Sequence, residues 1–357
     1  MKIEVYSPTI RRKEMDAVLT AMVEDRIGPG ERARLLLNTA REYLHYDFAL
    51  SLRSPAIALK LALSALNPEK GQGVIISALS PRYYADVIKD LDLCPLYCDV
   101  SLTSPCMGRE NIEQTLSAKP ENVHAFCIVL HHTLGYLPDT ASIAELGLPI
   151  IEDISHSFTV SSGAVKTENA QEESAVQKEQ VHGIFTILGL EERDMLTAGG
   201  GALLFAHNRK DGTVLRNFSG LPPEFCLPDI NAALAVVQFK EARRNLEKRA
   251  AIAQIYTQSS LRTRHKRFII PDHYDYNNYT FPLVLDTGLK DVLAYARKKD
   301  IILESAFEST IAGVSSGDAL GCPISYSLSL RTVLFPLYPR LRSAEAERVS
   351  KLIVTLP

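Results

Sequence analysis

The stretch Leu148-Pro149-Ile150-Ile151-Glu152-Asp153-Ile154-Ser155-His156-Ser157 decides the fold. A short apolar run leads directly into two carboxylates and then into polar residues. A run of this length, without the alternation of a half-exposed strand, indicates a strand that is buried on both faces. Such a strand belongs to a largely parallel sheet, because both of its faces need a covering layer. Asp153 comes just after this buried strand.

Short apolar runs of the same kind lie on both sides of this stretch and alternate with helix-like segments. One predicted helix runs from about Ala56 to Leu66 and is stopped by Asn67-Pro68. The alternation of strands with helices predicts an α/β core with a mostly parallel sheet. The apolar runs are 74–76, 96–98, 125–130, 148–151, 184–188 and 202–205.

The chain length favours two domains, since 357 residues correspond to roughly two units of about 150 residues. A long helix predicted from Ile230 to about Tyr256 connects them, with Arg243, Arg244, Lys248 and Arg249 mostly facing water. We therefore expect a large α/β domain over 1–240 and a small α+β domain over 241–357. Residues 161–182 are rich in Glu, Gln, Ser and Ala, and predict a mobile polar surface loop.

Composition narrows the class of protein. Hydrophobic residues make up 46% of the chain, which excludes a disordered or fibrous protein. The net charge is -3 and no dense basic tract occurs, so we expect no nucleic-acid partner. Neither an apolar signal segment nor a run long enough to cross a bilayer is found, and we expect a cytoplasmic protein without a membrane partner.

The cysteines do not predict a metal site. The chain has six, too few for a disulfide scaffold at this length. Cys94 and Cys98 are four positions apart, but no second Cys or His pair lies nearby at zinc spacing. We therefore expect no metal.

Several segments, taken in chain order, resemble the DegT/DnrJ/EryC1/StrS family. Residues 148–157 are close to that family's Leu-Pro-Val-Ile-Glu-Asp-Ala-Ala-Gln-Ala motif, and residues 199–203 resemble its Gly-Glu-Gly-Gly-Ala-Leu turn. Ser51 to Leu63 resembles its Ser-Gly-Thr-Ala-Ala-Leu signature. Further similar segments are 73–80, 94–100, 131–139, 185–187, 229–234 and 334–341.

This family consists of fold-type I, pyridoxal-phosphate-dependent (PLP-dependent) sugar aminotransferases that act as dimers. The resemblance therefore implies a three-layer, fold-type I PLP-transferase-like domain with a small C-terminal α+β domain. It also implies nucleotide-sugar chemistry of surface-polysaccharide biosynthesis, and PLP as the cofactor. In such enzymes the protein must supply a Schiff-base lysine, a carboxylate for the pyridine nitrogen, phosphate donors and a stacking side chain.

By the same resemblance, five residues are candidates for binding the cofactor. Asp153 would hold the pyridine nitrogen, although it could instead cap the segment that follows. His156 takes the place of the family's Gln, or is an ordinary loop residue. Ser54, Ala56 and Thr186 fall at the phosphate site, which is eroded because Pro55 has no N–H and Ala56 has no hydroxyl. The stacking position falls at Pro81, with Tyr83 and Tyr84 close by.

The position of the Schiff-base lysine decides the function. Counting back from Gly200 places it at Arg193, and counting forward from Phe185 places it at Glu191, so neither count meets a lysine. Arginine stays protonated and cannot act as the nucleophile. The flanking lysines are Lys178 and Lys210. No confident catalytic residue is therefore predicted, and PLP would not be bound covalently, if it binds at all.

Three hypotheses follow. The first is an inactive or altered member of the family that binds a sugar nucleotide or an active paralogue, as a homodimer or heterodimer. The second is a working aminotransferase that uses a lysine from elsewhere in the chain or from a neighbouring subunit. The third, an unrelated α/β binding protein, requires the ordered series of motifs to be coincidence.

Overall fold

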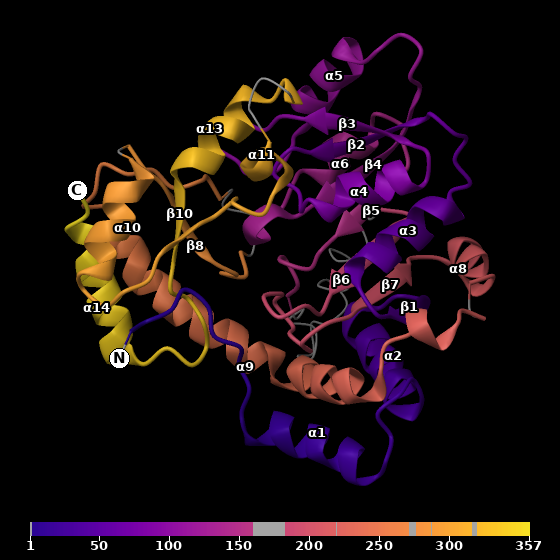
Figure 1. Ribbon diagram of the computed structural model, residues 1–357, viewed down its shortest axis with the longest axis horizontal. Coiled ribbons are helices and arrows are strands. Elements are labelled where there is room, and N and C mark those ends of the chain that lie inside the picture. Colours follow the sequence, from indigo (N-terminus) through magenta and orange to yellow (C-terminus); the bar gives the residue numbers. More distant parts are fainter. Residues whose placement is uncertain (1, 160–182, 219, 271–275, 287, 316–319) are drawn as a thin grey trace, which may run out of the picture.

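A computed structural model gives the fold and describes residues 2–159, 183–218, 220–270, 276–286, 288–315 and 320–357 (Figure 1). The polar loop predicted for residues 161–182 lies outside the described residues. Two sheets are present among them, a large one of seven strands and a small one of three.

The large sheet is mostly parallel, as predicted. Its order is β1-β7-β6-β5-β4-β2-β3, and β7 runs antiparallel to both of its neighbours, β1 and β6, while the other pairs are parallel. The strands are β1 Phe48–Leu52, β2 Gly73–Ser77, β3 Cys94–Cys98, β4 Ala125–His131, β5 Ile150–Asp153, β6 Phe185–Gly189 and β7 Ala202–Ala206.

Helices cover both faces of this sheet, which makes three layers. Alternate residues of β2 show the division: Val74 and Ile76 pack toward α3 and α4, whereas Ile75 packs toward α5 and α6. Near β6 and β7 the second face is covered by α2 and by the long helix α9. The helices are α1 Arg12–Val23, α2 Glu31–Leu44, α3 Pro55–Ala65, α4 Tyr83–Asp90, α5 Arg109–Ala118, α6 Thr140–Ala144, α8 Arg209–Arg216 and α9 Asp229–Ser260, with short 3-10 turns at η1 Thr133–Gly135 and η3 Pro223–Phe225.

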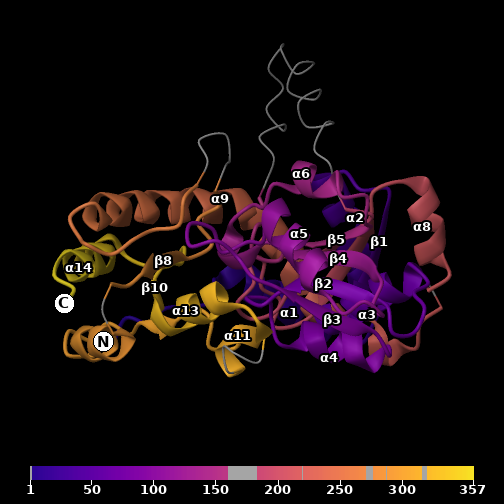
Figure 2. The ribbon, with the colours of Figure 1, turned by 90° about the horizontal axis from the view of Figure 1, so that it is seen from above.

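The small sheet is antiparallel, in the order β8-β10-β9, and has its own apolar core. Helix α9 runs from the large sheet to the small one (Figures 1 and 2). Ile3 also joins the small core and pairs with Ile301, so the first residues of the chain pack beside its last third. The division at residue 240 stays a prediction. The elements are β8 Phe281–Val284, α10 Leu289–Arg297, β9 Glu304–Ser305, α11 Ile311–Val314, α13 Pro323–Arg331, β10 Thr332–Phe335 and α14 Ser343–Val354.

The second half of α9 departs from the sequence prediction at Arg249. This side chain was expected in water but is buried, and its Nη1 donates to the carbonyl oxygens of Tyr279 at 2.7 Å and Leu337 at 2.9 Å. The reason is that the small sheet packs against this part of the helix. A buried guanidinium needs such acceptors, because burying a charged group without partners is costly.

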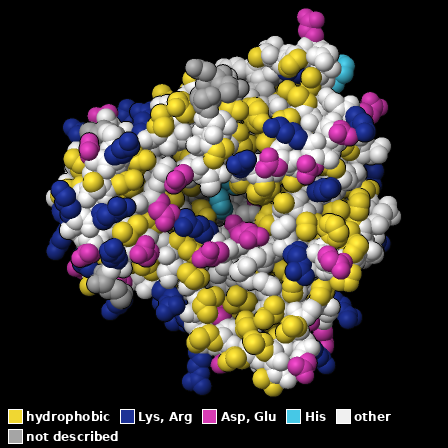
Figure 3. Space-filling model, viewed as in Figure 1, with side chains coloured by type: hydrophobic (Ala, Val, Ile, Leu, Met, Phe, Trp, Pro, Cys, Tyr) yellow, Lys and Arg dark blue, Asp and Glu magenta, His cyan; other side chains and the backbone are white. Residues whose placement is uncertain are grey.

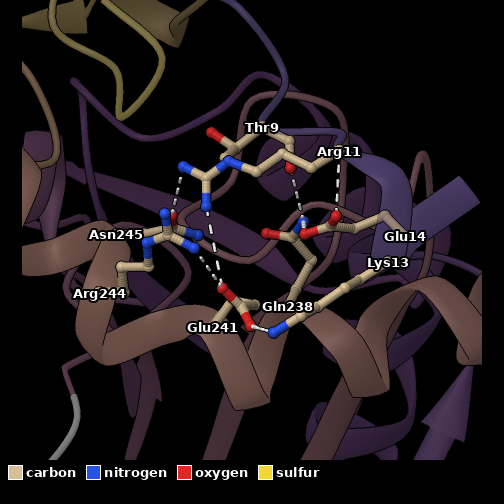
Figure 4. A network of polar contacts seen from close by, with 8 residues as sticks. All are labelled: Thr9, Arg11, Lys13, Glu14, Gln238, Glu241, Arg244 and Asn245. Carbon is tan, nitrogen blue, oxygen red and sulfur yellow. Dashed lines mark hydrogen bonds and ion pairs between the residues drawn. The ribbon is translucent and has the colours of Figure 1, made fainter.

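Helix α1 is tied to α9 by a polar network (Figure 4). Gln238, which is buried, donates to the Thr9 carbonyl at 3.0 Å and to Oε1 of Glu14 at 3.4 Å. At the surface, Glu241 pairs with Lys13 at 2.5 Å and with Arg244 at 3.5 Å. The network fixes the N-terminal segment along the long helix.

No helix in the described part of the chain combines the length and the apolar character needed to cross a membrane.

Candidate functional site

The candidate site lies at the carboxyl ends of three adjacent strands, β4, β5 and β6. His131 ends β4 and lies opposite Asp153, which ends β5; Asp153 lies opposite Ile187 near the end of β6. In open α/β sheets, ligands bind in the crevice outside these strand ends. On this face of the molecule Figure 3 shows a central hollow with a histidine side chain in it and acidic and basic side chains around it.

Asp153 is buried, and both of its carboxylate oxygens have partners in the protein. Oδ2 accepts a hydrogen bond of 2.5 Å from the hydroxyl of Tyr84. Oδ1 accepts from the Ser155 backbone N–H at 3.0 Å and also from the Ser155 hydroxyl. Burial, together with the nearby charge of Asp153, raises the pKa of the Tyr84 hydroxyl well above its ordinary value. Tyr84 therefore keeps its proton and remains a donor to Asp153.

His156 contacts two rings at the candidate site. It stacks on Tyr279 with centroids 4.2 Å apart and an interplanar angle of 13°, and meets His131 edge-on at 4.9 Å. Burial, together with a smaller effect of a neighbouring histidine, lowers the pKa of each of these two histidines to about 3. Both imidazoles are therefore neutral at pH 7. Asn277 holds the backbone of this loop by donating to the His156 carbonyl at 2.7 Å.

Asp194 also belongs to the site, although counting along the sequence did not single it out. Its Oδ1 lies 3.9 Å from Nε2 of His156, and its Oδ2 accepts from the Glu191 N–H at 2.8 Å. Burial is the largest cause that raises the pKa of Asp194 to about 8, and the charge of Asp153 contributes to this shift. At pH 7 the carboxyl is therefore mostly protonated, so its contact with the neutral His156 is not an ion pair.

Gly189 is the feature of the sequence that could have indicated this inward turn. A Cβ added there would lie 2.2 Å from Oδ2 of Asp194 and 2.8 Å from the Ser155 hydroxyl. Only glycine leaves room for both side chains against the end of β6. Even so, the sequence does not say which residue of the following loop fills that space.

The two residues predicted at the lysine position do not turn into this site. Arg193 is exposed and pairs with Glu304 at 2.6 Å, while its backbone carbonyl accepts from the Tyr279 hydroxyl at 2.8 Å. Glu191 is exposed as well, and its Oε1 accepts from the Gly201 N–H at 3.4 Å. Asp194 is the buried member of this loop beside Asp153.

The residues predicted at the phosphate site are not gathered around Asp153. Thr186 lies on the opposite face of the sheet, buried, with its hydroxyl bonded to that of Tyr46 at 3.1 Å. The Ser54 hydroxyl accepts from the Ile57 N–H at 3.3 Å and so caps helix α3, whose first turn holds Pro55 and Ala56. Of the five candidates, Asp153 and His156 are brought together.

These residues do not fit PLP held as an internal aldimine. The carboxylate expected at the pyridine nitrogen is already bonded to Tyr84 and Ser155, and Ser54 is engaged as a helix cap. The residues at the lysine position are Glu191, Glu192 and Arg193.

Among the described residues, no three His, Cys, Asp or Glu side chains are arranged so that they could hold a metal ion.

Curated relatives are similar to parts of this chain. GDP-perosamine synthase of Escherichia coli O157:H7 is 28% identical over 161 residues, covering 44% of this chain and 43% of the relative. The L-glutamine:2-deoxy-scyllo-inosose aminotransferase of Streptomyces lividus is 25% identical over 241 residues, covering 60% and 53%. The alignments thus span about half the length of these relatives.

Solved structures share the fold over nearly the whole chain. The PLP form of the sugar aminotransferase Spr1654 of Streptococcus pneumoniae has a TM-score of 0.83 at 16% identity, covering 99% of this chain and 98% of that one. The aminotransferase TlmJ of Streptoalloteichus hindustanus has 0.81 at 19%, covering 98% and 97%. The E. coli GDP-4-keto-6-deoxy-D-mannose-3-dehydratase with bound hydrated PLP has 0.81 at 12%, covering 99% of each chain.

The model of one family covers most of the sequence, matching residues 8–179 and 202–354. Its matched ranges include β5 with Asp153 and the strand β7 that follows the glycine turn, but they omit residues 180–201, where the Schiff-base lysine was sought. The chain belongs to the DegT/DnrJ/EryC1/StrS aminotransferase family.

Proposed function

We propose that this chain is a member of the family that no longer transfers amino groups through a lysine aldimine and that keeps the scaffold as a binding protein. The observation that carries the proposal is the loop at 191–194, where Glu191 and Arg193 face outward and the inward residue is the protonated Asp194. A carboxyl group cannot form an imine with an aldehyde, and the neighbouring guanidinium is not a nucleophile.

The ligand we propose is a nucleotide-linked sugar of surface-polysaccharide biosynthesis. The support is the similarity to GDP-perosamine synthase and the polar groups gathered at the strand ends, where Asp153, His131 and His156 lie together. Ligand sites in such sheets combine a few placed polar groups with apolar and aromatic side chains. PLP, by resemblance to the relatives, would bind here only without a covalent bond.

We further propose that the protein works in the cytoplasm as a dimer, either with itself or with an active paralogue. Helix α1 supports this, because Met15, Leu19 and Met22 are each more than half exposed on it, at 51%, 55% and 51%. Apolar side chains gathered on one surface helix mark a contact surface more often than chance exposure does.

Borohydride reduction tests the proposal. The purified protein is incubated with PLP, reduced, and examined by intact and peptide mass spectrometry, with Spr1654 of Streptococcus pneumoniae, which has a solved PLP form, treated in parallel as the positive control. We expect a reduced adduct on the control and none on this chain. A stoichiometric adduct on one lysine would overturn the proposal.

The second candidate function is a working aminotransferase, which the family match over most of the chain favours. The same experiment separates the two, because an adduct would identify the lysine by peptide mass. Lys210 lies in the first turn of α8, whereas Lys178 lies outside the described residues. Mixing experiments with a paralogue would show whether a lysine of a neighbouring subunit is used.

A further inference from the structure

A second polar cavity lies far from Asp153 along the sheet. It has a volume of about 440 Å³ and is formed where the end of α2, the start of β1 and helix α8 meet. Its walls carry three arginines, one carboxylate, one hydroxyl and one aromatic ring: Arg41, Arg209, Arg216, Asp47, Thr213 and Phe48.

The register of the sheet separates this cavity from the candidate functional site. Phe48, which lines the cavity, pairs with Ala206, and Ala206 in turn pairs with Phe185 at the start of β6. The cavity thus lies at the amino ends of the parallel strands, whereas Asp153 and Gly189 lie at the carboxyl ends. A ligand here would not touch the hollow around His156.

The arginines of the cavity are not neutralised by the protein. Arg216 lies over the Phe48 ring at 5.7 Å, and Arg41 Nε donates to the Tyr46 carbonyl at 3.4 Å. Within the described part of the chain, none of the three guanidiniums has a carboxylate within the 4.0 Å of an ion pair. Against one carboxylate, Asp47, the lining keeps a surplus of positive charge.

We propose that this cavity is a binding site for a small phosphate-bearing ligand, with a diphosphate group as the best match. The planar guanidinium presents paired N–H donors that match the spacing of phosphate oxygens, so three arginines lining one cavity favour a multiply charged phosphate group over a halide. The volume suits a small molecule. Gly212 allows α8 to lie close to Phe48, because a Cβ at this position would lie only 3.0 Å from Cβ of Phe48.

Calorimetric titration of the whole protein with inorganic pyrophosphate tests the site. We expect saturable binding of one equivalent, and a loss of affinity of about tenfold for Arg209→Gln, which corresponds to one charge-assisted contact. Arg243→Gln is the matched control, because Arg243 is exposed on α9 and its loss changes the net charge equally. Unchanged thermal unfolding of both variants shows that each folds.

Two further titrations complete the test. Asp153→Asn should leave pyrophosphate binding unchanged, because Asp153 lies at the opposite end of the strands. This result is expected whether or not the proposed function is correct, so the two proposals can fail separately. A single-stranded oligonucleotide should bind no more tightly than pyrophosphate, since the cavity holds only a small group. The proposal is overturned if pyrophosphate does not bind, if Arg209→Gln and Arg243→Gln bind alike, or if affinity rises steadily with oligonucleotide length.

Discussion

The hydroxyl of Tyr84 donates a 2.5 Å hydrogen bond to Oδ2 of Asp153, joining the first turn of α4 to the end of β5. Both side chains are buried. The carboxylate that resembles the family's pyridine partner is thus satisfied from inside the protein. This bond and those from Ser155 fix the Asp153 side chain within the packed structure.

Replacing Tyr84 with Phe tests how much this bond contributes. The change keeps the ring but leaves Oδ2 of Asp153 without its donor, and we expect the free energy of unfolding to fall by about 1.5 to 3 kcal/mol. Urea denaturation measures it. Tyr326→Phe on α13 is the control, because no hydrogen bond of its hydroxyl occurs among the described contacts. Equal effects of the two changes would show that the Tyr84 bond adds nothing.

Asp194→Asn should change how stability depends on pH. Burial raises the pKa of Asp194 to about 8 from 3.8, so between these values the folded protein binds a proton that the unfolded chain has released. Its contribution is fully present below about pH 4 and is lost as the pH rises to about 8. The amide never ionises. The stability advantage of the variant should therefore grow from pH 4 to pH 8 and then stay constant.

Urea midpoints measured at several pH values check this prediction. Asp300→Asn is the control, since Asp300 is exposed and should show no such trend. The histidines do not disturb the comparison. Their depressed pKa values, about 3 for both His131 and His156, make stability fall below about pH 6.5 in both proteins alike. A constant difference between Asp194→Asn and the natural chain would contradict the buried, protonated carboxyl.

Much of the fold was predictable because burial on both faces leaves a readable pattern. The apolar runs at 74–76 and 184–188 match β2 and β6 to within two residues. Strand β1 was not predicted, since an edge strand that is only half-buried has no continuous apolar run.

The site was less predictable than the fold. Asp153 and His156 follow a buried strand and were found from sequence. The partners Tyr84 and Asp194 contact Asp153 and His156 across 69 and 38 positions, respectively, which no local pattern encodes. Thr186 was misplaced because a strand residue can face either side of the sheet, and which face it takes depends on the register with its neighbours.

Arg249 should stabilise the packing of α9 against the small sheet. Arg249→Met keeps most of the packing but removes the donor that bonds the carbonyl oxygens of Tyr279 and Leu337. We expect the free energy of unfolding to fall by about 2 to 3 kcal/mol. Arg243→Met, on the exposed side of the same helix, should cost less than about 0.5 kcal/mol. Similar losses for both would mean that the buried bonds are dispensable.

The network of Figure 4 combines a buried part and an exposed part that should respond differently to salt. Glu241→Gln removes surface ion pairs and should lower the free energy of unfolding by less than about 1 kcal/mol. This effect should disappear in 1 M salt, where the Debye length is only about 3 Å. Gln238→Ala removes the donor of the Thr9 carbonyl and of Oε1 of Glu14, while Oε2 of Glu14 keeps the Arg11 N–H. The change should cost about 1 to 3 kcal/mol at any salt concentration. Denaturation in low and high salt separates the two.

Gly189→Ala should disrupt the arrangement of the site more than any other small change. The new Cβ would lie 2.2 Å from Oδ2 of Asp194 and 2.8 Å from the Ser155 hydroxyl, so at least one of these side chains must move. Overpacking of this kind costs about 1 to 3 kcal/mol. If Asp194 is the one displaced toward water, its pKa falls to its ordinary range, and the loss of stability between pH 4 and pH 8 disappears with it. Gly28→Ala is the control, because no atom lies within 4 Å of a Cβ placed there. A variant that kept both the stability of Gly28→Ala and the pH dependence of the natural chain would show that Asp194 does not pack over Gly189.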